Sequence, residues 1–421
     1  MTPASSEAGT ALPRAVSLRS NFIATFAGNA VYAATQWAVL SLIAKLGSAE
    51  MLGEYALAVA IATPVAMLSH LNLRAVLATD IQHRRPFGDY LSVRVVTTGA
   101  GLAVVIAIAL LAGYPAPLAA VVCLTGASLA AENVSDIYYG ALQRREHMTR
   151  IAYSMIVRGV ASAAALGIVL ALTRNLVWAA AAMALVRLAV LFAFDKPAGS
   201  RGESMERTSV HAQFALFRTA LPLGIVLMLS SLTANLPRYA IETELGTRAL
   251  GAFAAVASFL AVGSTIINAL GQSATPRLAR HFSAHEFRAF RILALKLCGL
   301  AAGVGLSGVA VALLLGEPVL ELVYRPEYGQ YSILLVGVML AGIPAYVANM
   351  LGYVITSTRS FASQMPLLGA AAAASALASW SLAPSFGLAG AVGALGVAAS
   401  VQILGALWIL WRTLRASESA V

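Results

Sequence analysis

The chain contains twelve long, almost uninterrupted apolar stretches, and the segments between them alternate between basic and nearly uncharged. A helix needs about 20 apolar residues to cross a bilayer, and each stretch is long enough for one crossing. Barrel strands are excluded because they are about 10 residues long and alternate in polarity. The pattern predicts an all-α, polytopic membrane protein of about twelve transmembrane helices. We place the spans at residues 20–45, 52–77, 92–113, 117–142, 149–172, 175–194, 213–240, 248–272, 288–315, 329–356, 362–382 and 387–412.

The composition excludes a soluble protein and offers no catalytic centre. Charged residues make up 11% of the chain, whereas a soluble domain carries about 25%. No P-loop is present, no histidines and cysteines have metal-ligand spacing, and no large outer loop holds a His/carboxylate pair. We therefore expect a protein that is not an enzyme and that uses no metal or other cofactor.

Positive charge concentrates on one side of the predicted bundle. The basic set of loops and ends carries Arg14, Arg19, Arg84, Arg85, Arg144, Arg145, Arg150, Lys196, Arg201, Arg207, Arg277, Arg280, Arg288, Arg291, Arg359, Arg412 and Arg415. The alternate set carries only Lys45, Arg174, Arg238, Arg248 and Arg325. Because cytoplasmic loops hold the excess of Lys and Arg, both termini are predicted to be cytoplasmic. The net charge of +10 predicts contact with anionic lipid headgroups, and its dispersal argues against nucleic-acid binding.

The sequence repeats itself once. Gln36 aligns with Asn235 at the offset that also aligns Arg19 with Arg218, and the motif beginning at Leu52-Gly53 faces Leu250-Gly251. Each half holds six spans, so both halves begin on the same side of the membrane and form parallel repeats about an axis along the membrane normal. The predicted domains are a disordered cytoplasmic N-terminus (1–17), an N-lobe (18–194), a cytoplasmic linker (195–212), a C-lobe (213–415) and a C-terminal tail (416–421).

Two carboxylates, Glu132 and Asp136, lie deep in the fourth predicted span, four residues apart and therefore on one helix face. Asp136 and Arg158 are equidistant from the turn near residue 147, which predicts an ion pair within the N-lobe. Arg187 is a competing partner. The alternative is a proton or cation coupling site at Glu132.

Several further polar residues lie in or beside the first, seventh and eighth spans. Arg19 and Arg218 occupy equivalent positions near the cytoplasmic ends of the first and seventh spans, either as interface anchors or as a cationic entrance for a phosphate. Arg238 follows Pro237 at the outer end of the seventh span, where the charge rule predicts no arginine. Gln36 and Asn235 form a matched pair that serves either helix-to-helix hydrogen bonds or sugar binding. Asn29 and Asn268 are similar cases.

The second half carries a set of short motifs in a characteristic order. They are Arg218-Thr-Ala-Leu-Pro-Leu-Gly224, Ala234-Asn-Leu-Pro-Arg-Tyr239, Leu250-Gly-Ala-Phe253 and Ala274-Thr-Pro-Arg-Leu-Ala-Arg280. With Leu52-Gly-Glu-Tyr55 in the first half, the set resembles bacterial oligosaccharide and polysaccharide (O-antigen-type) flippases. These belong to the multidrug/oligosaccharidyl-lipid/polysaccharide superfamily. The resemblance covers nearly all of residues 18–415.

The resemblance implies a two-lobed flippase of the inner membrane that moves undecaprenyl-pyrophosphate-linked oligosaccharide to the outer leaflet. Other polysaccharide-assembly membrane proteins are further expected partners. It also implies that the first, second, seventh and eighth spans line the cavity. The candidates on those spans are Arg19, Asn29, Gln36, Arg74, Arg218, Asn235, Arg238 and Asn268. Two alternatives stay open: a multidrug or cation antiporter of the same superfamily, and a membrane-embedded polysaccharide polymerase or ligase.

Overall fold

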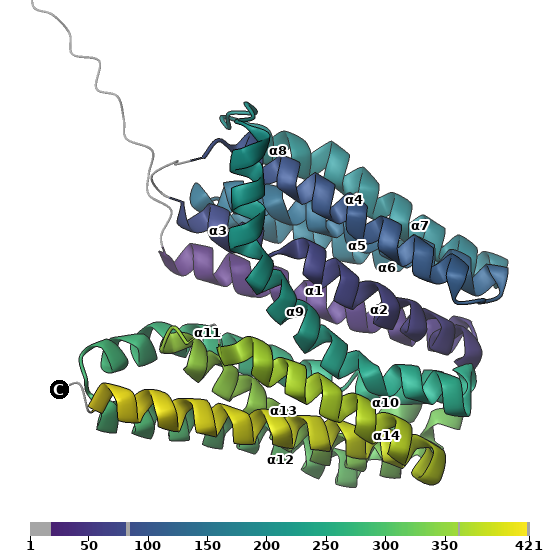
Figure 1. Ribbon diagram of the computed structural model, residues 1–421. Helices are drawn as coiled ribbons and strands as arrows, with labels where there is room; N and C mark the ends of the chain where they lie inside the picture. The colour runs from purple at the N-terminus through teal and green to yellow at the C-terminus, as the bar shows by residue number, and fades with distance from the viewer. Residues whose placement is uncertain (1–17, 81–84, 361–362, 419–421) are drawn as a thin grey trace, which may run out of the picture.

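The computed structural model describes residues 18–80, 85–360 and 363–418, with side chains from residue 25 to residue 417. All its regular elements in these ranges are helices (Figure 1). The first half contains α1 (Leu18–Leu46), α2 (Ala49–His70), α3 (Leu73–Thr79), α4 (Phe87–Leu111), α5 (Ala116–Arg144), α6 (Met148–Thr173), α7 (Leu176–Val190), a π-helical turn (Leu191–Asp195) and α8 (Lys196–Ser200). The second half contains α9 (Val210–Leu245), α10 (Thr247–Ala257), α11 (Leu260–Ser283), α12 (Phe287–Val323), a 3-10 turn (Pro326–Tyr331), α13 (Ser332–Ser357) and α14 (Gln364–Glu418). The predicted disordered segment 1–17 lies outside the described residues.

The number of crossings agrees with the apolar pattern. In the described ranges, nine helices are long and apolar enough to cross a bilayer, and α10 with α11 forms a tenth crossing bent by 43°. Two more come from α14 and α1. α14 is a hairpin broken at Gly387, because Gly405 on its second arm lies against Leu367 on its first. α1 is 29 residues long but less apolar, since it carries Asn29 and Gln36. The predicted all-α bundle of about twelve spans is confirmed.

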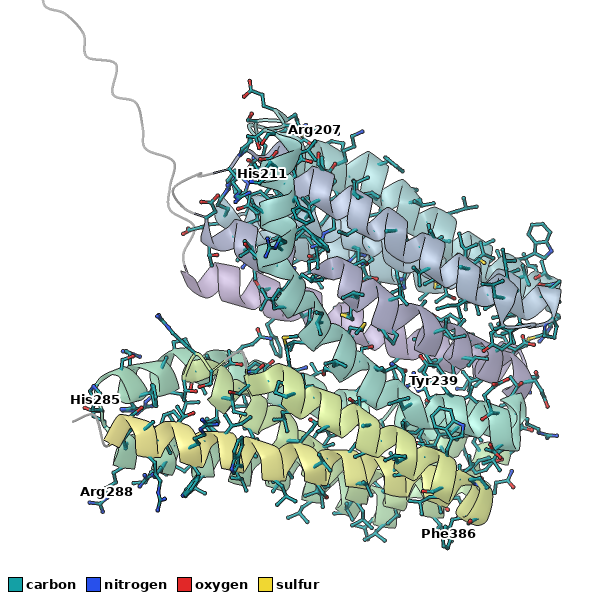
Figure 2. The ribbon with its side chains drawn as sticks, in the orientation of Figure 1. Arg207, His211, Tyr239, His285, Arg288 and Phe386 are labelled. Atoms are coloured by element: carbon teal, nitrogen blue, oxygen red, sulfur yellow. The ribbon has the colours of Figure 1, made fainter. Side chains whose placement is uncertain are left out.

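The helices form two lobes that meet at one end (Figure 1). Helices α1 to α8 make the first lobe, α10 to α14 make the second, and α9 joins them. Figure 2 places Arg207, His211, His285 and Arg288 at the end where the lobes diverge, and Phe386 at the opposite end. We call the diverging end the inner end and the end with Phe386 the outer end. Arg207 and Arg288, two arginines of the basic set, thus lie at the inner end, one in each half of the chain.

Helix α9 crosses from one lobe to the other. Its first turns pack on the first lobe, where Leu216 and Ala220 join an apolar cluster with Leu71 and Phe87. Further along, α9 packs on α14, and the Ser375 hydroxyl donates to the Thr233 carbonyl oxygen at 3.0 Å. The helix is 36 residues long and contains Pro222 and Pro237. Because each proline removes a helical hydrogen bond, α9 is able to bend as it crosses.

The repeated Leu-Gly motif lies where the outer ends of the lobes touch. A Cβ atom on Gly53 of α2 would lie 1.8 Å from the carbonyl oxygen of Thr247, and one on Gly251 of α10 would lie 2.0 Å from that of Ala49. Thr247 lies four residues before Gly251, and Ala49 lies four residues before Gly53. The two contacts are therefore equivalent, and they are related by the axis that relates the repeats. Only glycine lets two helix backbones approach this closely.

Basic residues at the outer end bind the last carbonyl groups of α1. Arg325, from the second lobe, donates to the carbonyl oxygens of Lys45 at 2.6 Å and Gly47 at 2.9 Å. Lys45 donates in return to the carbonyl oxygen of Leu322 at 2.7 Å, and Arg174 donates to that of Leu46. A helix C-terminus leaves carbonyl groups unpaired and carries partial negative charge. These contacts stabilise the α1 terminus and hold the lobes together.

The segment between α8 and α9 lies against the inner end of the first lobe. The Asp89 carboxylate, which is fully buried, accepts hydrogen bonds from the Thr208 backbone amide at 2.9 Å and its hydroxyl at 2.6 Å. Glu203 forms an ion pair with Arg144. The segment therefore has defined contacts with α4 and α5.

Candidate functional site: a buried charge network in the first lobe

Helix α5 presents two carboxylates to the interior of the first lobe. Glu132 accepts a hydrogen bond from the Tyr32 hydroxyl of α1 and pairs with Arg187 of α7, whose Nη1 lies 3.1 Å away. Arg158 of α6 lies 3.8 Å from the same carboxylate. Gln36 of α1 extends the network by accepting from Arg187 at 3.3 Å. Glu132 thus connects four helices.

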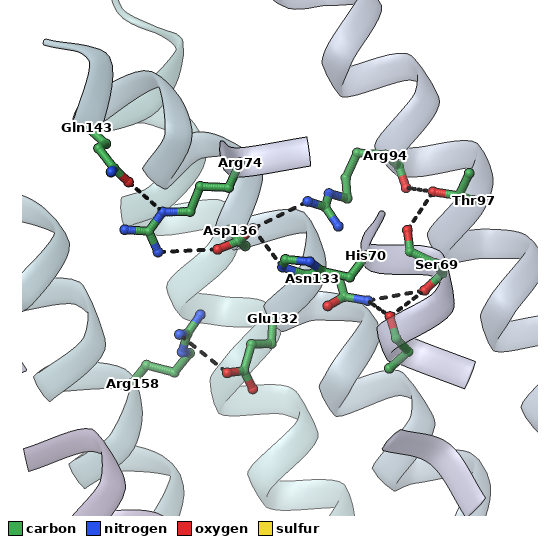
Figure 3. A network of polar contacts seen from close by, with 11 residues as sticks. Ser69, His70, Arg74, Arg94, Thr97, Glu132, Asn133, Asp136, Gln143 and Arg158 are labelled. Atoms are coloured by element: carbon green, nitrogen blue, oxygen red, sulfur yellow. Dashed lines mark hydrogen bonds and ion pairs between the residues drawn. The ribbon is translucent and has the colours of Figure 1, made fainter. Parts of the chain in front are cut away.

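Asp136, one turn further along α5, has a separate set of partners (Figure 3). Its carboxylate oxygens lie 2.8 Å from His70 Nε2, 3.3 Å from Arg74 Nη1 and 3.3 Å from Arg94 Nη2. These partners come from α2, α3 and α4. Arg74 also donates through Nε to Gln143 at 2.8 Å. Asp136 therefore joins the helices that Glu132 does not reach.

The predicted ion pair between Asp136 and Arg158 is wrong. Arg158 reaches Glu132 instead, and its guanidinium group lies over the rings of Tyr32 and Tyr139, at 5.2 Å and 5.4 Å from their centroids. Equal distance from the hairpin turn sets the height of an α-carbon, whereas an arginine side chain can extend over a full turn. Cation–π contacts determine which way this one extends.

Two basic members of the network, Arg94 and His70, are not among the candidates identified from the sequence. Arg94 lies just inside the predicted span 92–113, and an arginine within a span is itself a signal of a buried partner. His70 is the last residue of α2, and its ring lies against Asp136. α4 is joined to α5 by a short turn, whereas no pattern in the sequence indicates that α2 packs on α5.

The network has an excess of positive charge. Arg74, Arg94, Arg158 and Arg187 face only two carboxylates, Glu132 and Asp136, which leaves two positive charges uncompensated. Asp195, which accepts a hydrogen bond from Ser154, is a third carboxylate close to these residues. If it is counted, the excess of positive charge falls to one. An excess of buried cations favours an anionic ligand.

Several guanidinium groups also have free donors. The side chains of Arg94, Arg158 and Arg187 are 0%, 3% and 4% exposed, yet each keeps at least one N–H group without a partner among the described residues. Glu132 and Asp136, at 25% and 16%, are more exposed. Buried donors are rarely left unsatisfied. The arrangement is thus suited to accept oxygen atoms from a ligand that enters beside the carboxylates.

Helix α9, which joins the lobes, holds a smaller counterpart. Arg238 donates to the side-chain oxygen of Asn235 at 3.0 Å, as Arg187 does to Gln36, so each member of the matched pair accepts from an arginine. Arg238 has no carboxylate partner among the described residues. The amide of Gln36 on α1 and the amide of Asn235 on α9 therefore each lie beside an arginine. The arginine beside Asn235 has no carboxylate to balance its charge among the described residues.

The remaining candidates lie apart from the network. Arg218 is exposed near the inner end of α9, and Asn29 is exposed and donates to the Thr25 carbonyl of its own helix. Asn268 of α11 accepts hydrogen bonds from Asn349 and Tyr353 of α13, which ties it to the second lobe. The side chain of Arg19 lies outside the described residues.

Comparison with known proteins gives a consistent family and fold. The family model described as polysaccharide biosynthesis protein matches residues 18–282. The capsular polysaccharide biosynthesis protein CapF of Staphylococcus aureus is 24% identical over 326 residues, which cover 75% of this chain and 80% of that protein.

Two solved structures share the architecture over most of its length. The lipid II flippase MurJ in an inward closed conformation matches with a TM-score of 0.72 and 11% identity, over 95% of this chain and 90% of that chain. An inward-facing multidrug resistance MATE family transporter of the MOP superfamily matches with a TM-score of 0.70 and 12% identity, over 96% and 97%. At these identities, the likeness establishes the two-lobed transporter fold.

Proposed function

Because this chain belongs to the polysaccharide biosynthesis protein family, we propose that it is a flippase for lipid-linked oligosaccharide. Its substrate is undecaprenyl-pyrophosphate-linked oligosaccharide, which it moves from the inner to the outer leaflet of the inner membrane during the assembly of O-antigen, capsule or exopolysaccharide. The observation that supports this proposal best is the excess of buried arginine over carboxylate in the first lobe.

The pyrophosphate group is the part of such a substrate that cannot cross a bilayer unaided. As a diester it carries two negative charges, and an ion in hydrocarbon is stabilised only by a partner of opposite sign. Arginine suits this task because its planar fork of donors matches phosphate oxygens and it stays charged when buried. The free N–H groups of Arg94, Arg158 and Arg187 are therefore assigned to the diphosphate.

The other candidate residues have complementary roles. Arg218 and Arg19, near the inner ends of α9 and α1, capture the substrate from the inner leaflet, and Arg74 passes it to the network. Arg238 provides a second cationic contact on α9. The amides that do not serve the packing of helices bind the sugars; these candidates are Asn29, Gln36, Asn235 and Asn268.

The direction of transport follows from charge. With both termini cytoplasmic, the inner end faces the cytoplasm, where the lipid-linked sugar is made. An inside-negative potential favours outward movement of negative charge by roughly 2.3 kcal/mol per charge per 100 mV. The MATE-type fold also fits a cation or drug antiporter, but an excess of positive charge repels cationic drugs.

A transport assay tests the proposal. The protein is reconstituted in liposomes with a fluorescent undecaprenyl-pyrophosphate-linked sugar, and a membrane-impermeant reductant reports how much label has moved between leaflets. We expect the Arg218→Ala, Arg238→Ala double variant to transport at least roughly 100-fold more slowly, because each lost charged hydrogen bond contributes about 1.5–3 kcal/mol. Lysine at both positions should restore part of the rate, being a point charge without the fork.

The matched control is Arg248→Ala, which removes a residue whose side chain is 77% exposed and whose partner is Glu50. It should transport at the wild-type rate. Normal transport by the double variant would mean that Arg218 and Arg238 are interface anchors. Failure of the wild-type protein to move the lipid-linked sugar would overturn the proposed function itself.

A further inference from the structure

A long apolar groove lies between α9 and the first lobe. It has a volume of about 660 Å³ and is lined by α2, α4 and α9. Val104, on its α4 wall, is 48% exposed, so the groove opens onto the part of the surface that faces the bilayer. Tyr114 and Glu242 line its outer end, and Phe217 lies toward its inner end.

The sequence explains why the helices leave this space. Ala100 and Gly101 place almost no side chain on the α4 wall. Pro64 on the α2 wall has no N–H group, which leaves the carbonyl of Ala60 without its usual helical partner. The Tyr239 hydroxyl of α9 donates to that carbonyl and thereby holds α9 across the outer part of the groove.

The groove is joined to the charge network through two of its own lining residues. Ser69 and Thr97 line the groove, and both appear in the polar network of Figure 3. Thr97 donates to the Ser69 carbonyl at 2.9 Å, and Asn133 donates to the Ser69 hydroxyl at 3.2 Å. His70, the next residue, contacts Asp136. A polar path thus leads from the apolar groove to the cationic network.

We propose that this groove binds the prenyl chain of the lipid-linked substrate while its diphosphate occupies the charge network. The inference rests on the proposed function and adds to it a second binding site in the same protein. The free donors of the network favour this occupant over a bilayer phospholipid. Five guanidinium nitrogens of Arg94, Arg158 and Arg187 have no partner among the described residues, and the two phosphate groups of a pyrophosphate diester offer them more acceptor oxygens than the single phosphate of a phospholipid.

The dimensions of the groove agree with a hydrocarbon chain that runs along the bilayer normal. Its α4 wall extends from Thr97 to Ile108, a rise of about 16 Å. The hydrocarbon core of a bilayer is about 30 Å thick. The groove therefore extends through roughly half of this depth and keeps the chain beside the protein while the diphosphate moves.

The first experiment narrows the groove. Val104→Trp places a large ring inside it, and binding to the purified full-length protein is measured for two probes, an undecaprenyl pyrophosphate-linked sugar and its farnesyl analogue. We expect the undecaprenyl probe to bind at least about tenfold more weakly, because buried apolar contact is lost. The affinity of the farnesyl probe should fall much less. Val96→Trp is the matched control, since Val96 lies on α4, is 70% exposed and is not part of the groove.

The second experiment identifies the occupant. A photoreactive benzoylphenylalanine replaces Met228 on the α9 wall, and cross-linking to the undecaprenyl probe is measured in lipid nanodiscs. Excess undecaprenyl pyrophosphate should suppress the cross-link, and excess phosphatidylglycerol should not. Equal suppression by both would identify an ordinary lipid site and overturn the inference, as would unchanged binding by Val104→Trp. A wild-type protein that binds neither probe would instead refute the proposed function, and the inference with it.

Discussion

Replacing Asp136 by alanine is expected to lower the free energy of unfolding by about 3–5 kcal/mol, because the change leaves the buried Arg94 without its carboxylate. The Arg94 side chain is fully buried and has no other carboxylate within reach among the described residues. Thermal unfolding of the purified protein in nanodiscs measures the effect. Glu327→Ala is the control: its side chain is 53% exposed, its partner is Arg325, and surface pairs of this kind contribute at most about 1 kcal/mol.

A double variant separates the two possible partners of Asp136. Asp136→Ala with Arg94→Leu should be clearly more stable than Asp136→Ala alone, since no unpaired buried charge remains. Asp136→Ala with Arg158→Ala should not recover, because it also removes one of the two arginine partners of Glu132. The opposite ranking would restore the ion pair between Asp136 and Arg158 and contradict the structure.

The second large effect concerns the contact between the repeats. Gly53→Leu is expected to force the outer ends of the lobes apart, because even a Cβ atom there would overlap the Thr247 carbonyl oxygen. Overpacking of this kind costs about 1–3 kcal/mol or more, and 3 kcal/mol changes the ratio of two conformations roughly a hundredfold. Gly251→Leu should have the same effect, since its contact with Ala49 is the symmetric one.

Spin-label distances measure this change in a variant whose two native cysteines are replaced by alanine. One pair of labels at Asn175 and Phe386 reports the outer end, and another at Thr79 and His285 reports the inner end. In both glycine variants, the outer distance should lengthen and the inner distance should shorten. Gly99→Leu is the control, because no atom lies within 4 Å of a Cβ built there. Unchanged distances in Gly53→Leu would show that the outer contact does not control the opening of the lobes.

The site was only partly predictable from the sequence. A carboxylate inside a span implies a cationic partner, and Glu132 with Arg158 and Arg187 fulfils that expectation. The choice among partners depends on which helices pack together and on how long side chains extend, and neither appears in a linear pattern. Asp136 illustrates this, since its partners come from α2, α3 and α4, at 42 to 66 residues' distance along the chain.

The basic residues at the outer end are a second case in which the sequence predicts the location of a residue but not its contacts. The charge rule assigned Lys45, Arg174 and Arg325 to the outer side without giving them a role. In the structure they bind carbonyl oxygens at the end of α1 or of α12. Those carbonyls are unpaired because each helix ends there. Only the approach of the lobes brings Arg325 close to α1.

The apolar stretches alone determined that this protein is a bundle of membrane-spanning helices, because unpaired backbone groups are too costly in hydrocarbon for any open alternative. The internal repeat determined that the bundle has two halves. Which residues face each other was decided only by tertiary structure. Packing within a membrane depends on small residues and on individual polar pairs rather than on a hydrophobic pattern, so the charge network, the glycine contact and the groove appear only once the helices are assembled.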